Sequence, residues 1–189
     1  MARWQPNASE RLVLAALDLF DGRGYEKTTF IEIAERAGLT KSTFFRHFAD
    51  KREVLFGGDT MAGLLAEGIE TAPEGATAVE AVAHALDVIG REAFTPERRE
   101  FSARRRAVIA ANPELQEREA LKGLALTASM TEALERRDTP ALTACLAAQL
   151  GALALKIAYE RWSETIDGRD FGEYARQILR ELQMASDHL

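Results

Sequence analysis

Signals that begin helices recur along the whole chain, and they constrain its fold more than any other feature. Four capping-box patterns place a short polar residue three positions before a glutamate, at Asn7–Glu10, Thr29–Glu32, Asp50–Glu53 and Asp170–Glu173. Three more starts pair a cap residue with a following proline, at Thr95-Pro96, Asn112-Pro113 and Thr139-Pro140. No segment alternates apolar and polar residues over five or more positions with the β-branched enrichment of a strand. The sequence therefore predicts an all-α protein.

The spacing of apolar residues between these starts predicts about nine helices. They cover roughly residues 8–22, 29–36, 40–46, 50–71, 76–93, 96–111, 113–136, 140–164 and 170–186. A chain of 189 residues is long enough for one large domain or two small ones that share a core.

The first three predicted helices are short and closely spaced. On the first, an apolar stripe repeats with helical spacing over Leu12, Ala15, Ala16, Leu19 and Phe20. On the second, the residues expected to be buried are Ile31, Ile33, Ala34 and Ala37. Gly38 then allows the positive φ of a tight turn, and Thr40 caps the third helix.

Charge is distributed unevenly along the chain, whose formal net charge is −6. Residues 1–56 carry nine Lys/Arg and eight Asp/Glu, so their net charge is +1, whereas the remaining residues have a net charge of −7. Only the N-terminal third can therefore approach a phosphate backbone without strong repulsion.

Two helices joined by a tight glycine turn, the second rich in basic and hydroxyl side chains, are typical of a helix-turn-helix. Such a motif places its second helix in the major groove and presents its N-terminal residues to base edges. That helix carries Lys41, Ser42, Thr43, Arg46 and His47. The pattern therefore indicates a DNA-binding surface.

Residues 11–56 resemble the DNA-binding domain of the tetracycline-repressor (TetR) family of bacterial regulators. The matching residues are Ala15-Ala16, Leu19-Phe20, Gly24-Tyr25, Thr28-Thr29, Ile33-Ala34, Ala37-Gly38, Thr43, His47-Phe48 and Lys51. The resemblance implies a homodimeric repressor with a DNA-binding domain at residues 1–52 and a ligand-binding and dimerisation domain at residues 53–189. It also implies a palindromic operator in double-stranded DNA, a small-molecule inducer, and an interface made by the last two helices.

Nine residues are expected to contact DNA, by matching positions and by their chemistry: Thr29, Thr40, Lys41, Ser42, Thr43, Phe45, Arg46, His47 and Lys51. Lys41 and Arg46 can donate to guanine O6 and N7, and Arg46 is our first choice for reading a base. Thr43 offers a methyl group to thymine, while His47 and Lys51 are expected to contact the backbone. Phe45 stands where the family usually has a tyrosine whose hydroxyl contacts a phosphate. Without that hydroxyl, we expect Phe45 either to touch a thymine methyl group or a sugar, or to cost some affinity.

Each of these assignments has a simpler alternative. Thr29 and Thr40 are needed as helix caps with or without DNA. His47 and Lys51 can be ordinary surface residues, and Arg46 can pair with Asp50 four positions later.

From Ala141 to Ala158 nearly every residue is apolar or small on all sides of the predicted helix. Such a helix must be buried all round, so we expect one face to pack on its own domain and the other on a second subunit. The alternative is a central core helix of a monomer. Cys145, the single cysteine, is expected to be a buried small hydrophobe. The longest apolar run, Ala144 to Leu155, is shorter than the roughly 20 residues of a bilayer span, so no membrane partner is expected.

Two arginines fall on or beside the apolar stripe of the helix over residues 96–111. An arginine that faces a core needs an anionic partner, so Arg104 and Arg105 are expected to meet either a glutamate or an acidic ligand. The glutamates considered are Glu114, Glu117 and Glu119. Residues 98–119, which include the segment NPELQ, also loosely resemble the sensor domain of regulators that bind acyl-CoA-like compounds. That resemblance implies a fatty acyl or other amphipathic acid as the inducer.

Large apolar residues in the C-terminal part are further candidates for lining a ligand pocket: Phe94, Phe101, Met130, Tyr159 and Trp162. Metal-ligand spacings, glycine-rich phosphate loops and nucleophile motifs are absent from the sequence, so neither a metal, a cofactor nor an enzymatic activity is expected. A single cysteine fits a reducing cytoplasm. The different-class alternative is a small-molecule carrier whose helix-turn-helix no longer reads specific DNA.

Overall fold

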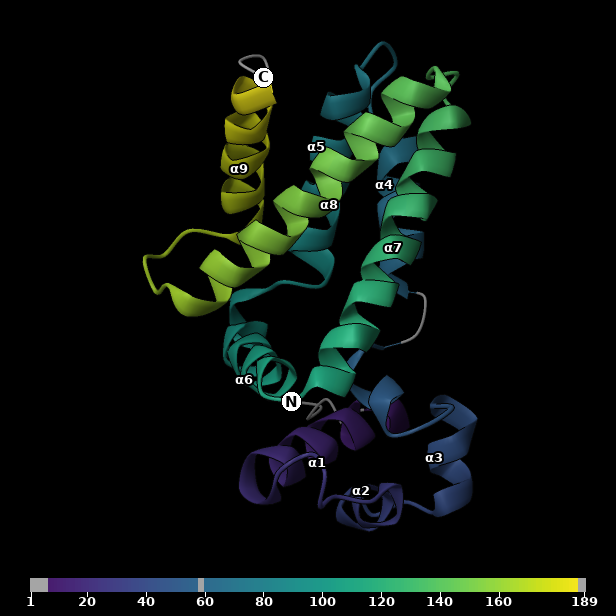
Figure 1. The fold of residues 1–189 in the computed structure, drawn as a ribbon, viewed down its shortest axis with the longest axis vertical. Helices are drawn as coiled ribbons and strands as arrows, with labels where there is room; N and C mark the ends of the chain where they lie inside the picture. The colour runs from purple at the N-terminus through teal and green to yellow at the C-terminus, as the bar shows by residue number, and fades with distance from the viewer. Residues whose placement is uncertain (1–6, 58–59, 187–189) are drawn as a thin grey trace, which may run out of the picture. The chain divides into compact units, whose positions relative to one another are not determined.

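A computed structural model describes residues 7–57 and 60–186, and throughout these ranges the only regular structure is helical. The N-terminal helices are α1 (Ala8–Arg23), α2 (Phe30–Arg36) and α3 (Lys41–His47), drawn in purple and blue in Figure 1. A 3₁₀ turn, η1 (Arg52–Leu55), follows them. The remaining elements are α4 (Thr60–Glu70), α5 (Ala78–Glu92), η2 (Pro96–Arg98), α6 (Arg99–Ala110), α7 (Pro113–Glu135), α8 (Ala141–Glu164) and α9 (Phe171–Ser186). The predicted all-α fold is confirmed for the described residues.

Two predicted helices begin later than the sequence indicated. The segment expected to be one helix over residues 50–71 consists of η1 and, after a break, α4. Gly57 has a positive φ of 52°, which ends the 3₁₀ turn and is incompatible with a continuous α-helix. The prediction that Gly57 and Gly58 lie in a helix is therefore wrong for Gly57, while Gly58 lies outside the described residues. The helix expected from residue 96 starts with η2 and becomes α-helical at Arg99.

The helix caps predicted at Thr29 and Asp170 are observed as specific hydrogen bonds, whereas the predicted proline starts of η2 and α8 have no side-chain cap hydrogen bond. The Thr29 hydroxyl accepts from the Glu32 amide, and the Glu32 carboxylate accepts from the Thr29 amide. Asp170 and Glu173 make the same reciprocal pair before α9. An unpredicted capping box, Thr77 with Glu80, begins α5.

The chain divides into two compact units. Among the described residues, the first contains 7–57 together with 104–120, and the second contains 60–103 and 121–186. Most of α6 and the first turns of α7 thus belong with the N-terminal helices, in contrast to the predicted boundary after residue 52. Apolar residues at the α6–α7 junction explain this grouping, because Val108, Ile109 and Leu115 are buried.

The core of the first unit is formed where α1, α2 and α3 meet. Leu12, Ala16 and Phe20 of the predicted stripe are buried, but Leu17 is buried as well and Leu19 is only partly so. Ile33, Ala34 and Ala37 are buried as predicted. Ile31 is 45% exposed, so the prediction that it faces the core is wrong.

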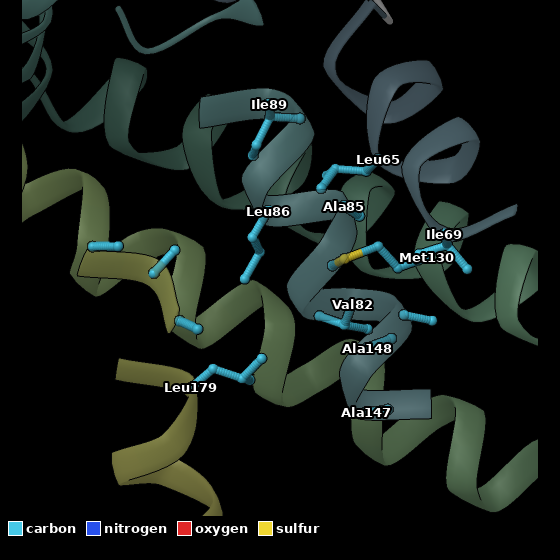
Figure 2. Packing of buried hydrophobic residues seen from close by; sticks show 14 of the residues in the cluster. Leu65, Ile69, Val82, Ala85, Leu86, Ile89, Met130, Ala147, Ala148 and Leu179 are labelled. Carbon is cyan, nitrogen blue, oxygen red and sulfur yellow. The ribbon is translucent and has the colours of Figure 1, made fainter. Parts of the chain in front are cut away.

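The core of the second unit surrounds α5. Figure 2 shows Val82, Leu86 and Ile89 of α5 at the centre, with side chains of α4 and α9 on opposite sides of them. Met130 of α7 and the small residues of α8 complete the cluster. Small residues allow helices to approach closely here, and a Cβ atom added at Gly151 would lie 2.5 Å from the Val82 side chain.

The α4–α5 contact gives a stability prediction, because Gly68 of α4 faces the α5 backbone. A Cβ atom at Gly68 would lie 2.6 Å from Ala85 Cα, and backbone cannot move aside as a flexible side chain can. We expect Gly68→Ala to lower the free energy of unfolding by roughly 1–3 kcal/mol, measured by urea denaturation. Gly63→Ala on the same helix is the matched control, because nothing lies within 4 Å of its Cβ position. Equal stabilities for the two variants would contradict the close packing.

Helix α8 is longer than the apolar run within it. Its 24 residues are long and apolar enough to cross a membrane by length and composition alone, so the expectation based on run length was too narrow. The core helix of a soluble protein passes the same test, and one face of α8 packs in the core through Ala144, Ala148 and Ala154. Only 33% of the most apolar 18-residue segment of α8 is buried, which leaves a second apolar face of the helix exposed. Cys145 lies on that exposed part and not in the core, contrary to the prediction.

Candidate DNA-binding surface

Helix α3 is held at its start by two threonines. The Thr40 hydroxyl accepts from the Thr43 amide at 3.2 Å, and the two threonine hydroxyls are hydrogen-bonded to each other at 3.0 Å. The predicted cap is therefore present. The Thr43 hydroxyl already has a partner, while its side chain remains partly exposed.

The turn before α3 is fixed from α1. Gly38 has a φ of 66°, as predicted for the turn of a helix-turn-helix. The guanidinium of Arg11 donates to the carbonyl oxygen of Ala37, which fastens α1 to the turn. Arg11 was not singled out from the sequence, since its role depends on a contact across 26 positions.

Three phenylalanines of this segment have different environments. Phe44 and Phe48 are buried, and their ring centroids lie 5.7 Å apart. Phe45 is 43% exposed. Phe44 and Phe48 therefore attach α3 to the core, while Phe45 remains at the surface.

The polar residues of α3 point away from this core. Lys41, Ser42, Arg46 and His47 are all exposed. Among the described residues Arg46 has no hydrogen-bond or ion-pair partner, because Asp50 instead accepts from Arg52 at 2.7 Å. The alternative in which Asp50 neutralises Arg46 is therefore not realised, and the Arg46 charge is available to a ligand.

Lys41 lies against two aromatic rings. Its Nζ atom is 5.2 Å from the centroid of the Phe30 ring and 5.8 Å from that of Phe45. The two rings are 4.9 Å apart. Phe30 is the first residue of α2, and no local sequence signal indicates its contact with Lys41, because the two residues lie on different helices.

Two predicted phosphate contacts have other partners within the chain. The Thr29 amide and hydroxyl both donate to Glu32, and these bonds lower the pKa of the Glu32 carboxyl. Lys51 donates to the carbonyl oxygen of Tyr25 at 2.9 Å and lies over the Tyr25 ring. The observed bonds of Thr29 are thus those of a helix cap. One N–H group of the Lys51 ammonium is used by Tyr25, which leaves fewer donors for a phosphate.

Arg104 and Arg105 both belong to the first unit, and both are engaged there. Arg104 bridges two aspartates of α1, with Nε–Oδ2 of 2.6 Å to Asp21 and Nη2–Oδ1 of 2.8 Å to Asp18. The bond from Arg104 lowers the pKa of Asp18. Arg105 donates to the carbonyl oxygen of Leu55 and pairs with Glu119, one of the glutamates expected from the sequence. The aspartate partners of Arg104 were not expected, since they lie more than 80 positions away.

The other five proposed ligand residues lie in the second unit. Phe94 contacts Tyr159 and Trp162, with ring centroids 5.2 and 5.8 Å apart. Met130 is fully buried in the core, and Phe101 is partly buried, with no ring contact to another described residue. The Trp162 indole N–H is buried and has no acceptor among the described residues. The structure therefore brings together Phe94, Tyr159 and Trp162, and it gives Met130 a packing role.

A cavity of about 290 Å³ lies in the first unit, between the end of α1 and the end of α6. Its lining includes Phe20, Tyr25, Val108 and Asn112, and none of the proposed ligand residues. The Tyr25 hydroxyl is buried with no well-formed hydrogen bond among the described residues, and burial, together with the nearby Glu114 carboxylate, raises its pKa.

Sequence comparison finds similarity to known proteins in the N-terminal segment. Residues 12–56 match the model of bacterial regulatory proteins of the tetR family. The HTH-type transcriptional regulator TcmR of Streptomyces glaucescens is 51% identical over 45 residues, which are 24% of this chain and 20% of TcmR. The chain thus matches about a fifth of the length of that curated relative.

Solved structures resemble the whole chain in fold. The regulator SmeT of Stenotrophomonas maltophilia, in a complex with triclosan, is 19% identical with a TM-score of 0.58, over 95% of this chain and 91% of SmeT. A TetR-family regulator of Mesorhizobium loti is 20% identical with a TM-score of 0.56, over 95% of this chain and 96% of its own. At sequence identities of 19% and 20%, this likeness is a similarity of fold alone.

Proposed function

We propose that this chain, whose residues 12–56 match the model of the tetR family, is a ligand-responsive transcriptional repressor of that family. It binds a palindromic operator as a homodimer and releases it when a small molecule binds the second unit. A repressor of chromosomal DNA in a bacterium works in the cytoplasm. The observation that carries the proposal is the exposed face of α3, where Lys41, Ser42 and Arg46 follow a glycine turn with positive φ.

The charge distribution supports DNA as the partner of this face. The formal charge of residues 1–56 is +1 in a chain whose total is −6, and Arg46 is not neutralised by any described residue. In a carrier protein that no longer reads DNA, no function would require Lys41 and Arg46 to be exposed on this helix without a carboxylate partner among the described residues.

Dimerisation is proposed through α8 and α9, over about residues 140–164 and 170–186. Three leucines spaced by helical turns are exposed on α8 within the described part of the chain, since Leu142 is 83%, Leu146 57% and Leu153 44% exposed. Cys145 lies on the same face. An apolar stripe of this length is expected to be covered in solution, and a second copy presents the complementary surface.

A gel-shift titration with genomic DNA fragments tests the regulatory function. A specific repressor selects the DNA upstream of its target genes, and its affinity falls steeply with salt because phosphate contacts release counterions. Salt-dependent binding without sequence preference would contradict the proposal. Complete absence of DNA binding, together with binding of a small molecule, would favour the carrier protein.

The inducer site is proposed around Phe94, Tyr159 and Trp162 of the second unit. The unpaired indole N–H of Trp162 supports a ligand that carries a hydrogen-bond acceptor. Phe101 is a further lining residue. Arg104 and Arg105 are less suited to hold an acidic ligand, because carboxylates and a carbonyl oxygen of the chain already accept from them.

Inducer titrations with the arginine variants test this assignment. We expect Arg104→Ala and Arg105→Ala proteins to release the operator at the same concentration of a saturated acyl-CoA, or of triclosan, as the unsubstituted protein. A Phe94→Ala protein is expected to need at least about fivefold more, because an aromatic wall of the site is lost. Release is measured as loss of fluorescence anisotropy of a labelled operator. A large shift for both arginine variants, with none for Phe94→Ala, would restore the acidic-ligand hypothesis.

The residue at position 45 gives a second binding prediction. Tyrosine in place of Phe45 adds a hydroxyl at an exposed ring edge, where the family usually contacts a phosphate. We expect Phe45→Tyr to tighten operator binding by about 0.5–1.5 kcal/mol, the net contribution of one hydrogen bond. A gel shift at fixed salt measures the change. Unchanged or weaker binding would show that this ring does not approach the backbone.

A further inference from the structure

The exposed side of α3 carries an unusual cluster, formed by one lysine and two phenylalanines. Phe30 begins α2, while Lys41 and Phe45 lie on α3, so the cluster joins the two helices of the helix-turn-helix. The ring centroids of Phe30 and Phe45 are 4.9 Å apart, with an interplanar angle of 59°. We call Phe30, Lys41 and Phe45 the aromatic–lysine cluster.

The Lys41 ammonium lies beside both rings of the cluster. It is 5.2 Å from the Phe30 centroid and 5.8 Å from the Phe45 centroid, within the range of cation–π attraction. Among the described residues no carboxylate pairs with Lys41, so its charge is not neutralised. A cation–π contact that favours one position of the lysine stem reduces the conformational entropy lost when the lysine binds a ligand.

The internal contacts of Phe45 leave a large part of its ring exposed. It touches Phe30, Phe44 and Lys41, and still 43% of its surface is accessible. Its neighbours on the same helix, Ser42 and Arg46, are exposed and polar. An apolar surface is therefore presented among hydrogen-bond donors, on the element expected to enter the major groove.

The edges of the bases offer one apolar group to such a surface. In the major groove this is the C5-methyl group of thymine, whereas guanine offers the acceptors O6 and N7 to a lysine. We infer that the aromatic–lysine cluster reads a thymine methyl through Phe45, next to the group that accepts from Lys41. The inference rests on the proposed DNA-binding function and adds a base preference to it.

The experiment removes single methyl groups from the DNA. The operator is obtained by selecting bound duplexes from a random pool, and each thymine of a half-site is then replaced by deoxyuridine. At one position per half-site we expect this replacement to lower the affinity of the full-length protein by about three- to tenfold. 5-Methylcytosine at that position is expected to bind more tightly than cytosine, because it restores the methyl group.

Protein variants connect the methyl group to the cluster. Phe45→Ala is expected to bind thymine and deoxyuridine operators equally at that position. Leu14→Ala is the matched control, because it removes another exposed apolar side chain, on α1, and should keep the preference. Phe30→Leu removes one ring beside Lys41. In a double-mutant cycle, Lys41→Ala is therefore expected to lower operator affinity less in the Phe30→Leu protein than in the unsubstituted protein. Circular dichroism checks that each variant is folded.

Two results would overturn the inference while leaving the proposed function intact. One is that all deoxyuridine operators bind within twofold of the thymine operator. The other is that Phe45→Ala keeps the same methyl dependence, which assigns the contact to another residue such as Thr43. If the selection yields no preferred duplex at all, the proposed regulatory function fails, and the inference falls with it.

Discussion

Substituting Leu146 by aspartate is expected to convert the protein into a monomer and to lower its affinity for a palindromic operator by about a hundredfold or more. Leu146 is 57% exposed, so the aspartate should not disturb the core of its own subunit. Across a two-fold interface, however, two carboxylates would be buried without partners. A monomer carries only one DNA-binding domain. In a dimer, the second domain binds its half-site at a high effective concentration, and the loss of this advantage accounts for the size of the effect.

Light scattering and anisotropy titration measure these two outcomes in the same sample. Leu124→Asp is the control, because Leu124 is an exposed leucine of α7 outside the α8 stripe, and this variant should remain dimeric. The single cysteine gives an independent measurement. Cys145 should react slowly with a thiol reagent in the dimer and faster in the Leu146→Asp protein. A dimeric Leu146→Asp protein with normal affinity would contradict an interface on this face.

Removing the Arg46 side chain should weaken operator binding by about 1–3 kcal/mol, which is a loss of affinity of roughly fivefold to a hundredfold. Arg46 is exposed on α3 and has no partner in the described residues that would hold it away from DNA. If it reads guanine, Arg46→Ala also relaxes the preference at one base pair. The affinity is measured at several salt concentrations against operators with each base at every position.

Arg36→Ala is a matched control for Arg46. Arg36 is an exposed arginine of α2, but it pairs with Asp18 at 3.5 Å, and we expect a change of less than threefold. If Arg46→Ala instead lowers affinity equally for all sequences and reduces the salt slope by about one, Arg46 contacts a phosphate. Unchanged affinity would exclude Arg46 from the DNA contact altogether.

Local signals in the sequence were sufficient for the helices and for the helix-turn-helix. A cap is formed by atoms of residues three or four positions apart, so the reciprocal bonds of Thr29 with Glu32 can be predicted from the local sequence. The same holds for the positive φ of Gly38, which needs only the turn residue itself. The burial of Phe44 and Phe48 and the exposure of Phe45 follow from helical periodicity.

Contacts between distant segments could not be obtained in this way. Arg104 was assigned to a glutamate or a ligand because periodicity places it near an apolar stripe, yet its partners are Asp18 and Asp21 of α1. Lys51 bonds to Tyr25, which reduces its expected role at the DNA backbone. The exposure of Ile31 also differs, because a helix of seven residues is too short for periodicity to fix its buried side.

The sequence by itself determined the all-α class, the positions of most helix starts, the glycine turn and the exposed polar side of α3. These features depend on hydrogen bonds and dihedral angles within a few residues. The tertiary structure alone decided which carboxylates neutralise Arg104 and Arg105, and it placed Phe30 beside Lys41 and Phe45. The physical reason is that ion pairs and ring contacts depend on distances between helices, which the packing of the core sets and local sequence does not encode.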